Sequence, residues 1–332
     1  MRETTLRQQE YSQHDGPAGH APVQRTIPVR SYRGRFAPSP TGPLHAGSLV
    51  AALASWLDAR AHDGKWLIRI ENIDTIRERP GAAAQQLAQL QRYGMVSDEP
   101  VWTQTERYAA YESALRQLDR AGRTYICHCS RARVAGEQVE GGPAYPGTCR
   151  TLGLAAPGAV RLVVEPGVVE VADRAAGMLR QDVAATVGDF VIRRSDGLWS
   201  YQLAVVVDDA AQGITDVVRG ADLLDNTPRQ VVLQRALGLA PPRTLHVPLV
   251  RDRAGRKLSK QDEAQPLGAR SALAELEQAW QHLGFAPTGA ATVAQFQDRA
   301  VVQWRLRHGP QGGRTSRAAA AGFECPVPEI PR

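Results

Sequence analysis

The sequence lacks any long apolar run. No stretch of the 332 residues approaches the roughly 20 apolar residues that span a membrane, and the first residues lack the apolar core of a secretory signal. No internal repeat is apparent either. We therefore expect a soluble, cytoplasmic protein of one large or two modest domains, with no membrane partner.

Cysteine is scarce: the chain has four, and three of them, Cys127, Cys129 and Cys149, lie close together. Without an export signal they indicate a reducing compartment, where clustered thiols are more often metal ligands than disulfides. Cys325, near the end of the chain, is expected to be free. The excess of positive over negative charge is small. The net charge of +6 permits a polyanionic partner but does not require one.

What the sequence does contain is a strand–turn–helix–strand pattern between residues 33 and 73. Gly34–Ala37 is short and apolar at its centre, and the three prolines of Pro38–Pro43 exclude regular structure there. A helix is predicted to begin near His45, and the apolar run Trp66–Ile70 is typical of a buried parallel strand. In such a crossover, the turn and the helix start lie where anions and nucleotides bind.

The rest of the chain alternates predicted strands and helices, which indicates a parallel α/β sheet. Helices are predicted at residues 82–93, 108–121, 227–237, 271–283 and 293–306, and strands at 160–164, 168–171, 189–193, 199–207, 214–218 and 245–250. The second half of this sheet would carry Tyr201 and Arg219 to loop ends facing the first half. Residues 125–150 have little apolar content, so this insertion needs a cross-link, such as a bound metal ion, to hold its shape.

Two motifs carry a family resemblance. RFAPSPTG at Arg35–Gly42, followed by HAGS at His45–Ser48, resembles the first signature of class I glutamyl-tRNA synthetases, and KLSKQ at Lys257–Gln261 resembles their second, ATP-binding signature. Ser48, where the full-length enzymes usually have histidine, and Gln261 favour a shortened branch, the glutamyl-queuosine tRNA(Asp) synthetases. The resemblance covers roughly residues 33–310. It implies a class I aminoacyl-tRNA synthetase fold: a Rossmann-like α/β catalytic domain with a small zinc-binding insertion and a short helical C-terminal part.

The corresponding domain boundaries follow from the motifs and the composition. We expect a disordered extension at 1–32, the catalytic domain at 33–262 with its insertion at about 125–150, the helical part at 263–308 and a disordered tail at 309–332. The chain after Lys260 is too short for the anticodon-binding region of ordinary glutamyl-tRNA synthetases.

The resemblance implies that the enzyme activates L-glutamate with ATP and magnesium in the absence of tRNA. The glutamyl group would then pass to the cyclopentenediol of queuosine in the anticodon loop of tRNA(Asp). We expect a monomer. Two alternatives stay open: a minimal glutamyl-tRNA synthetase charging a tRNA 3′ end, and a non-catalytic tRNA-binding paralogue. Against the second stands the retention of five motif residues, namely His45, Glu71, Tyr201, Arg219 and Lys260.

Candidate site residues follow from what the substrates need. A dicarboxylic amino acid requires cations for its carboxylates and an anion for its ammonium group, and arginine grips a carboxylate bidentately. The predicted glutamate-binding residues are Arg35, Phe36, Ala37, Pro38, Ser39 and Glu71, together with Tyr201 and Arg219, which the resemblance implies. The predicted ATP-binding residues are His45, Gly47, Ser48, Lys257 and Lys260, of which His45 and Lys260 are the catalytic candidates. Each assignment has a plainer alternative. His45 would then be only a helix-capping or core histidine, the loop with Lys257 and Lys260 a solvated surface run, and Glu71 and Asp74 a pair of acidic residues that binds no ligand.

The insertion is predicted to hold one structural zinc ion. Cys127, Cys129 and Cys149 supply three thiolates, and a tetrahedral site needs a fourth ligand. The resemblance assigns that position to Tyr145, whereas His128 lies between two ligands and is expected to point away. The alternative is that the three cysteines are simply buried as small apolar residues. Basic side chains nearby, at Arg131, Arg133 and Arg150, are candidates for phosphate contacts with tRNA.

Overall fold

The structure is a computed structural model that describes residues 31–130, 133–134, 144–249 and 267–310. Lys257, Lys260 and Gln261, and nearly all of the expected extension and tail, lie outside the described residues. Tyr32, which we had assigned to the extension, is buried, and its hydroxyl donates to Asp58 Oδ2 at 2.6 Å.

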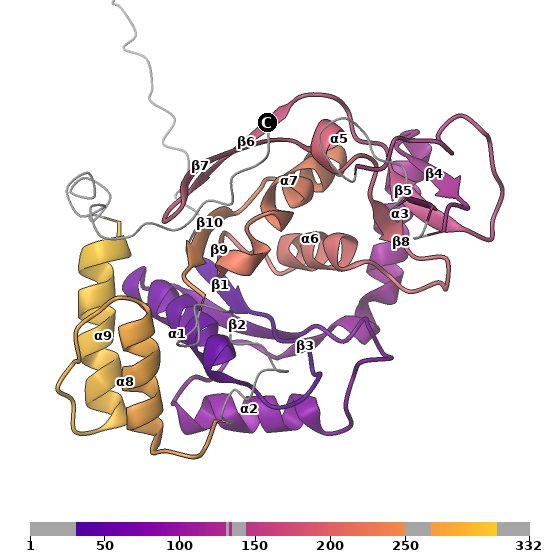
Figure 1. Ribbon diagram of the computed structural model, residues 1–332. Coiled ribbons are helices and arrows are strands. Elements are labelled where there is room, and N and C mark those ends of the chain that lie inside the picture. Colours follow the sequence, from indigo (N-terminus) through magenta and orange to yellow (C-terminus); the bar gives the residue numbers. More distant parts are fainter. Residues whose placement is uncertain (1–30, 131–132, 135–143, 250–266, 311–332) are drawn as a thin grey trace, which may run out of the picture. The chain divides into compact units, whose positions relative to one another are not determined.

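A parallel three-stranded sheet forms the first half of the described fold. Strands β1 (Arg33–Phe36), β2 (Lys65–Ile70) and β3 (Trp102–Thr103) lie in this order. Helix α1 (Ala46–Ala61) makes the crossover from β1 to β2 and buries its apolar face against the sheet, and α2 (Ala82–Arg92) follows β2 (Figure 1). The predicted crossover at 33–73 is therefore confirmed.

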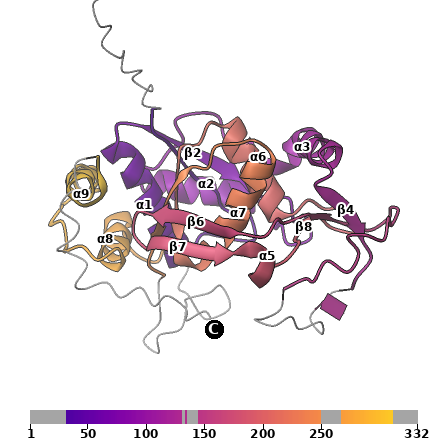
Figure 2. The ribbon, with the colours of Figure 1, turned by 90° about the horizontal axis from the view of Figure 1, so that it is seen from above.

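The second half centres on the parallel pair β9 (Asp216–Gly220) and β10 (Arg243–Val247). The Thr215 N–H donates to the Arg33 carbonyl at 2.9 Å, so the chain entering β9 lies beside β1. Next to β10 lies an antiparallel hairpin, β6 (Val168–Asp173) and β7 (Gly177–Asp182), which Figure 2 shows beside α7 (Asn226–Ala236). The carboxyl ends of β1 and β9 thus meet at one edge, as a parallel α/β sheet requires.

The prediction of a strand at 199–207 is wrong: this segment starts helix α6 (Tyr201–Ala211). Ser200 caps the helix by accepting the Leu203 N–H at 3.3 Å. Leu203, Ala204, Val205 and Val206 are all buried, so α6 has no polar face to reveal a helical period. Tyr201 therefore stands on a helix start and not at the end of a strand.

A small antiparallel sheet carries the cysteine-containing insertion. It consists of β4 (Thr124–Cys127), β5 (Ala159–Leu162) and β8 (Val191–Arg193). The segments expected at 160–164 and 189–193 do form strands, but in this separate sheet and not in the parallel one. Four further helices lie elsewhere along the described chain: 3-10 helix η1 (Gln104–Arg107) after β3, α3 (Tyr108–Arg120) before β4, α5 (Val183–Thr186) after β7, and 3-10 helix η2 (Ala221–Leu223) after β9.

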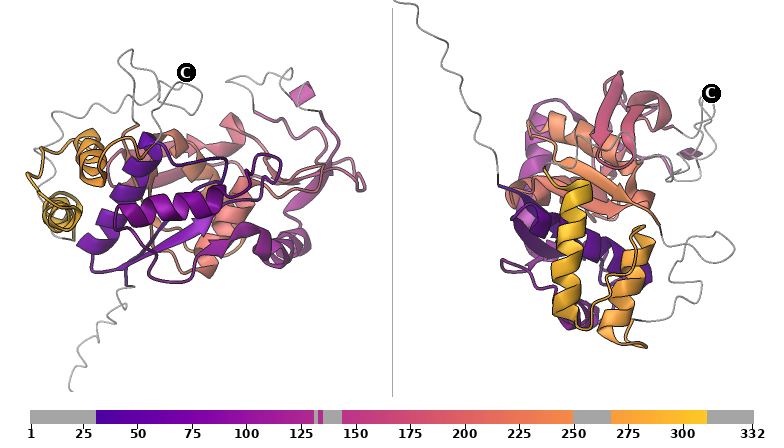
Figure 3. Two further views of the ribbon diagram at one scale, coloured as in Figure 1. Left: turned by 90° about the horizontal axis from the view of Figure 1, so that it is seen from below. Right: turned by 90° about the vertical axis from the view of Figure 1, so that its left-hand side faces the viewer.

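Two helices end the described chain: α8 (Ala272–His282) and α9 (Val293–His308). Both pack on α1, as the right-hand view of Figure 3 shows. The buried Asp58 of α1 fixes this arrangement, because it accepts from Trp304 Nε1 at 2.9 Å and from both Nη atoms of Arg174. No helix among the described residues is long and apolar enough to cross a membrane.

Candidate active site

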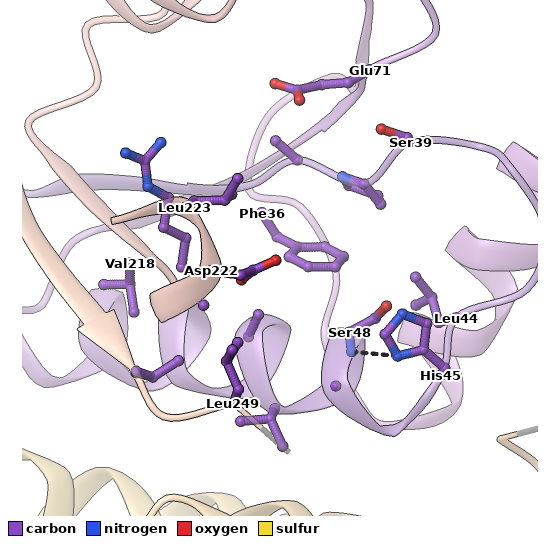
Figure 4. A pocket seen from close by; sticks show the side chains of 18 of the residues that line it. Phe36, Ser39, Leu44, His45, Ser48, Glu71, Val218, Asp222, Leu223 and Leu249 are labelled. Atoms are coloured by element: carbon purple, nitrogen blue, oxygen red, sulfur yellow. Dashed lines mark hydrogen bonds between the residues drawn. The ribbon is translucent and has the colours of Figure 1, made fainter. Parts of the chain in front are cut away.

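A pocket of about 550 Å³ opens at the carboxyl ends of β1 and β9, next to the start of α1. Eleven predicted site residues line it: Arg35, Phe36, Ala37, Pro38, Ser39, His45, Gly47, Ser48, Glu71, Tyr201 and Arg219. Figure 4 shows His45 and Ser48 at one end of this pocket and Glu71 at the other. The structure therefore brings together every predicted glutamate- and ATP-binding residue that lies within the described part of the chain.

His45 caps α1 and also lines the pocket. Its Nδ1 accepts the Ser48 backbone N–H at 3.2 Å (Figure 4). A neutral imidazole with Nδ1 as acceptor carries its proton on Nε2, which is then a donor. Gly47 permits this arrangement, because a Cβ there would lie 3.1 Å from the ring. The helix start adds its own positive electrostatic end, so this end of the pocket suits an anion.

Arg35 is buried and already has a carboxylate partner. Its Nε and Nη2 donate to the two oxygens of Asp209, on α6, at 3.1 and 3.3 Å. Asp209 also accepts from Arg69 Nη2 at 2.8 Å, and the same nitrogen donates to Glu71 at 3.1 Å. Burial raises the pKa of Glu71, although Arg69 and Arg35 oppose this. Arg35 and Glu71 thus belong to one buried ionic network.

Arg219 lies in a different environment. Its Nε donates to His246 Nε2 at 3.0 Å, its Nη2 to Thr227 Oγ1 at 2.7 Å and its Nη1 to the Tyr201 hydroxyl at 3.5 Å. Among the described residues no carboxylate forms an ion pair with it, and burial lowers the pKa of its guanidinium. Arg219 therefore brings to the pocket wall a positive charge that, among the described residues, has no carboxylate in direct contact, although Asp209 and Glu71 attract it from farther away.

Sequence reasoning missed the residues behind the pocket wall: Arg69, Asp209, Thr227, His246 and Asp173. The only local signal was a charged residue inside the apolar run Trp66–Ile70. An arginine at a buried position needs an acidic partner, so Arg69 predicts that such a partner exists. The local sequence does not indicate which residue it is.

The predicted metal ligands also converge. The three sulfur atoms of Cys127, Cys129 and Cys149 lie within 4.8 Å of one another. The Tyr145 hydroxyl lies 3.3 Å from the Cys127 sulfur and 3.7 Å from that of Cys129. His128 points elsewhere, as expected, with Nε2 3.0 Å from the Ala155 carbonyl oxygen.

The chemistry of this cluster suits zinc. Burial acts to raise the pKa of the Cys127 thiol, but the hydrogen bond with Tyr145 and the nearby Arg161 lower it to about 7. Three thiols with one phenol oxygen offer the sulfur-rich, four-ligand set of a closed structural zinc site. The residues present therefore fit the metal.

Comparisons with known proteins agree with this geometry. Residues 31–272 match the family model described as tRNA synthetases class I (E and Q), catalytic domain. The chain is 55% identical over 289 residues to a glutamyl-Q tRNA(Asp) synthetase of Bordetella bronchiseptica. The matched region covers 84% of this chain and 90% of that one. It is 53% identical to a protein of the same name from Burkholderia mallei, covering 84% of this chain and 98% of that one.

Among solved structures, the chain resembles a glutamate tRNA ligase from Elizabethkingia meningosepticum, crystallised with its amino acid. The TM-score is 0.67 at 24% identity, over 82% of this chain and 64% of that chain. This likeness confirms the predicted fold, and this chain spans about two thirds of the length of that structure. The match over residues 31–272 and the relatives of nearly equal length, at 53% and 55% identity, show that the chain belongs to the glutamyl-Q tRNA(Asp) synthetases, a branch of the class I synthetase family.

Proposed function

We propose that this protein joins L-glutamate to the queuosine of tRNA(Asp) in two steps, using ATP. In the first step a glutamate carboxylate oxygen attacks the α-phosphorus of ATP, and the bond from that phosphorus to pyrophosphate breaks. In the second, a hydroxyl of the cyclopentenediol attacks the acyl carbon and loses its proton, an ester forms, and AMP leaves with the bonding electrons and can take up that proton on a phosphate oxygen. The observation that carries the proposal is one pocket lined by Arg35, Glu71, Tyr201 and Arg219 beside the start of α1.

The glutamate end of the pocket offers complementary charge. Arg219 has no carboxylate in direct contact among the described residues, so a substrate carboxylate can form an ion pair with its guanidinium. Arg35 contributes less net charge to the pocket because it already forms an ion pair with Asp209. Its chief role would be to offer N–H donors to the substrate. Glu71, with Phe36–Ser39 along the adjacent backbone, lines the place for the ammonium group.

At the ATP end, His45 Nε2, Gly47 and Ser48 supply donors for phosphate oxygens at the start of α1. Lys257 and Lys260, which lie outside the described residues, are proposed to supply positive charge to the phosphates, with Lys260 stabilising the charge that builds as pyrophosphate leaves. The nucleotide is taken to bind as its magnesium complex.

Zinc, when bound by Cys127, Cys129, Tyr145 and Cys149, is proposed to be structural. It would hold together the cysteine-containing end of this small sheet, where the cluster of buried residues in the described part of the chain consists of the ligands themselves and a few partly buried neighbours. No step of the reaction passes through it. The tRNA would be tRNA(Asp) carrying queuosine.

The test is glutamate-dependent exchange of labelled pyrophosphate into ATP without tRNA, followed by transfer of labelled glutamate to purified tRNAs. We expect exchange without tRNA and transfer only to tRNA(Asp) that contains queuosine. Transfer to the 3′ end of tRNA(Glu) would instead identify a minimal glutamyl-tRNA synthetase. A complete lack of exchange would identify a non-catalytic tRNA-binding paralogue.

A further inference from the structure

Behind Arg219 lies a buried pair of side chains with no part in the function proposed so far. His246, on β10, has Nε2 3.0 Å from Arg219 Nε and Nδ1 2.6 Å from Asp173 Oδ2, at the end of β6. Both side chains are fully buried. Neither lines the pocket itself. A buried chain of three side chains thus ends at Arg219, a pocket arginine for which the described residues offer no carboxylate in direct contact.

The direction of these hydrogen bonds is determined. Arginine has only donors, so His246 Nε2 must accept from Arg219. A neutral imidazole has one N–H, which is then on Nδ1 and donates to Asp173. Asp173 is fixed in turn, because its other oxygen accepts the backbone N–H groups of Ala175 and Ala176 at 3.0 and 2.8 Å. Only the Nδ1–H form of His246 satisfies this chain.

The same contacts decide which edge of Arg219 faces the substrate. The Nε edge of the guanidinium is engaged by His246, through Nε, and by Thr227, through Nη2. Nη1 also donates to the Tyr201 hydroxyl at 3.5 Å, which leaves one N–H group on each of the two terminal nitrogens for a substrate carboxylate. Without His246 the side chain would keep its charge but lose the acceptor that sets its rotation.

We infer that His246, held in one tautomer by Asp173, is a positioning residue that fixes Arg219 for a carboxylate of the amino acid substrate. The inference rests on the proposed function, since it assigns the carboxylate to glutamate. His246 touches no substrate; it acts through Arg219. It should therefore affect glutamate binding and leave ATP binding alone.

The test compares His246→Leu, which removes the acceptor, with His246→Gln, whose amide oxygen can accept from Arg219 while its N–H groups donate to Asp173. The matched control is His62→Leu, which also replaces a buried imidazole by leucine but at the end of α1, away from the pocket. Glutamate binding is measured by titration calorimetry, and KM for glutamate and for ATP by pyrophosphate exchange.

We expect His246→Leu to weaken glutamate binding on the order of 10- to 100-fold, the usual cost of losing a hydrogen bond to a charged group. KM for ATP should change less than about twofold, and His246→Gln should recover most of the glutamate affinity. His62→Leu should bind glutamate as the wild type does. Nitrogen-15 NMR of the wild-type protein should show the Nδ1–H tautomer for His246.

Three results would overturn the inference. They are unchanged glutamate binding in His246→Leu, an equal loss of glutamate and ATP affinity in that variant, and a glutamine variant as defective as the leucine one. The proposed function fails separately: a wild-type protein that binds no glutamate at all would refute it, and this inference with it.

Discussion

The two walls of the pocket treat their charges in opposite ways. In the first wall, built by β1, β2 and the facing helix α6, Arg35 and Glu71 are tied into a network with Arg69 and Asp209. In the second wall, Arg219 rests on neutral acceptors. The first wall is electrostatically satisfied before substrate arrives, whereas the second is completed by the substrate. Fold stability should therefore depend on the first wall and glutamate affinity on the second.

The sharpest test of this contrast is Arg219→Gln. Removing this cation leaves a substrate carboxylate without its charged partner, so kcat/KM for glutamate should fall on the order of 1,000-fold or more. The free energy of unfolding should stay the same or rise, because a buried charge with no direct carboxylate partner among the described residues is costly in the free protein. Pyrophosphate exchange and urea unfolding check the two halves of this expectation. A variant that loses stability together with activity would erase the distinction between the walls.

The complementary change is Asp209→Asn in the first wall. It leaves Arg35 and Arg69 buried with too little negative charge, and breaking a buried pair in this way costs about 3–5 kcal/mol. The free energy of unfolding in urea should fall by that amount. Asp196→Asn serves as the control, because Asp196 pairs with Arg194 at the surface and its loss should cost less than about 1 kcal/mol. Equal stability losses in the two variants would contradict a structural role for the first wall.

The same contrast explains what the sequence could predict. The prolines after β1 and the run Trp66–Ile70 are local signals, so the first crossover was predictable from them, whereas pocket residues such as Tyr201 and Arg219 were assigned on the family resemblance. The start of α6 was mistaken for a strand because Leu203–Val206 is buried on every side, and only the capping Ser200 marked a helix. Partners such as Asp209 and His246 lie far along the chain from the arginines they hold, and no local pattern encodes those pairings.

The cysteine cluster, unlike these distant pairings, was predictable from the sequence, because Cys127, Cys129 and Cys149 lie close together along the chain. It belongs to the small antiparallel sheet and not to either pocket wall. We expect one equivalent of bound zinc per chain in the wild type and well below half in Cys149→Ser, as measured by elemental analysis of the purified proteins. Glutamate-dependent exchange should change less than about threefold, because no pocket residue is a ligand. A large loss of exchange would show that the pocket depends on this sheet.

The smallest expected effect lies at the amino ends of β1 and β2, away from the pocket. Glu99 accepts from both Nη atoms of Arg33 and from Lys65, and the hydrogen bond from Arg33 is the main cause that lowers its pKa to about 2. A lowered pKa in the folded state stabilises the protein above the ordinary glutamate pKa, and the contribution disappears as the pH falls toward 2.

Glu99→Gln should therefore lower the free energy of unfolding by about 0.2–1 kcal/mol at pH 7, because the charges are partly exposed and screened by salt. The difference from the wild type should shrink below about pH 4, where the unfolded chain begins to bind the proton. Urea unfolding across this pH range, at low and high salt, measures it. Pyrophosphate exchange should not change, since Glu99 is at the end of the sheet opposite the pocket. A stability difference that persists at low pH would show that packing, and not charge, is what Glu99 contributes.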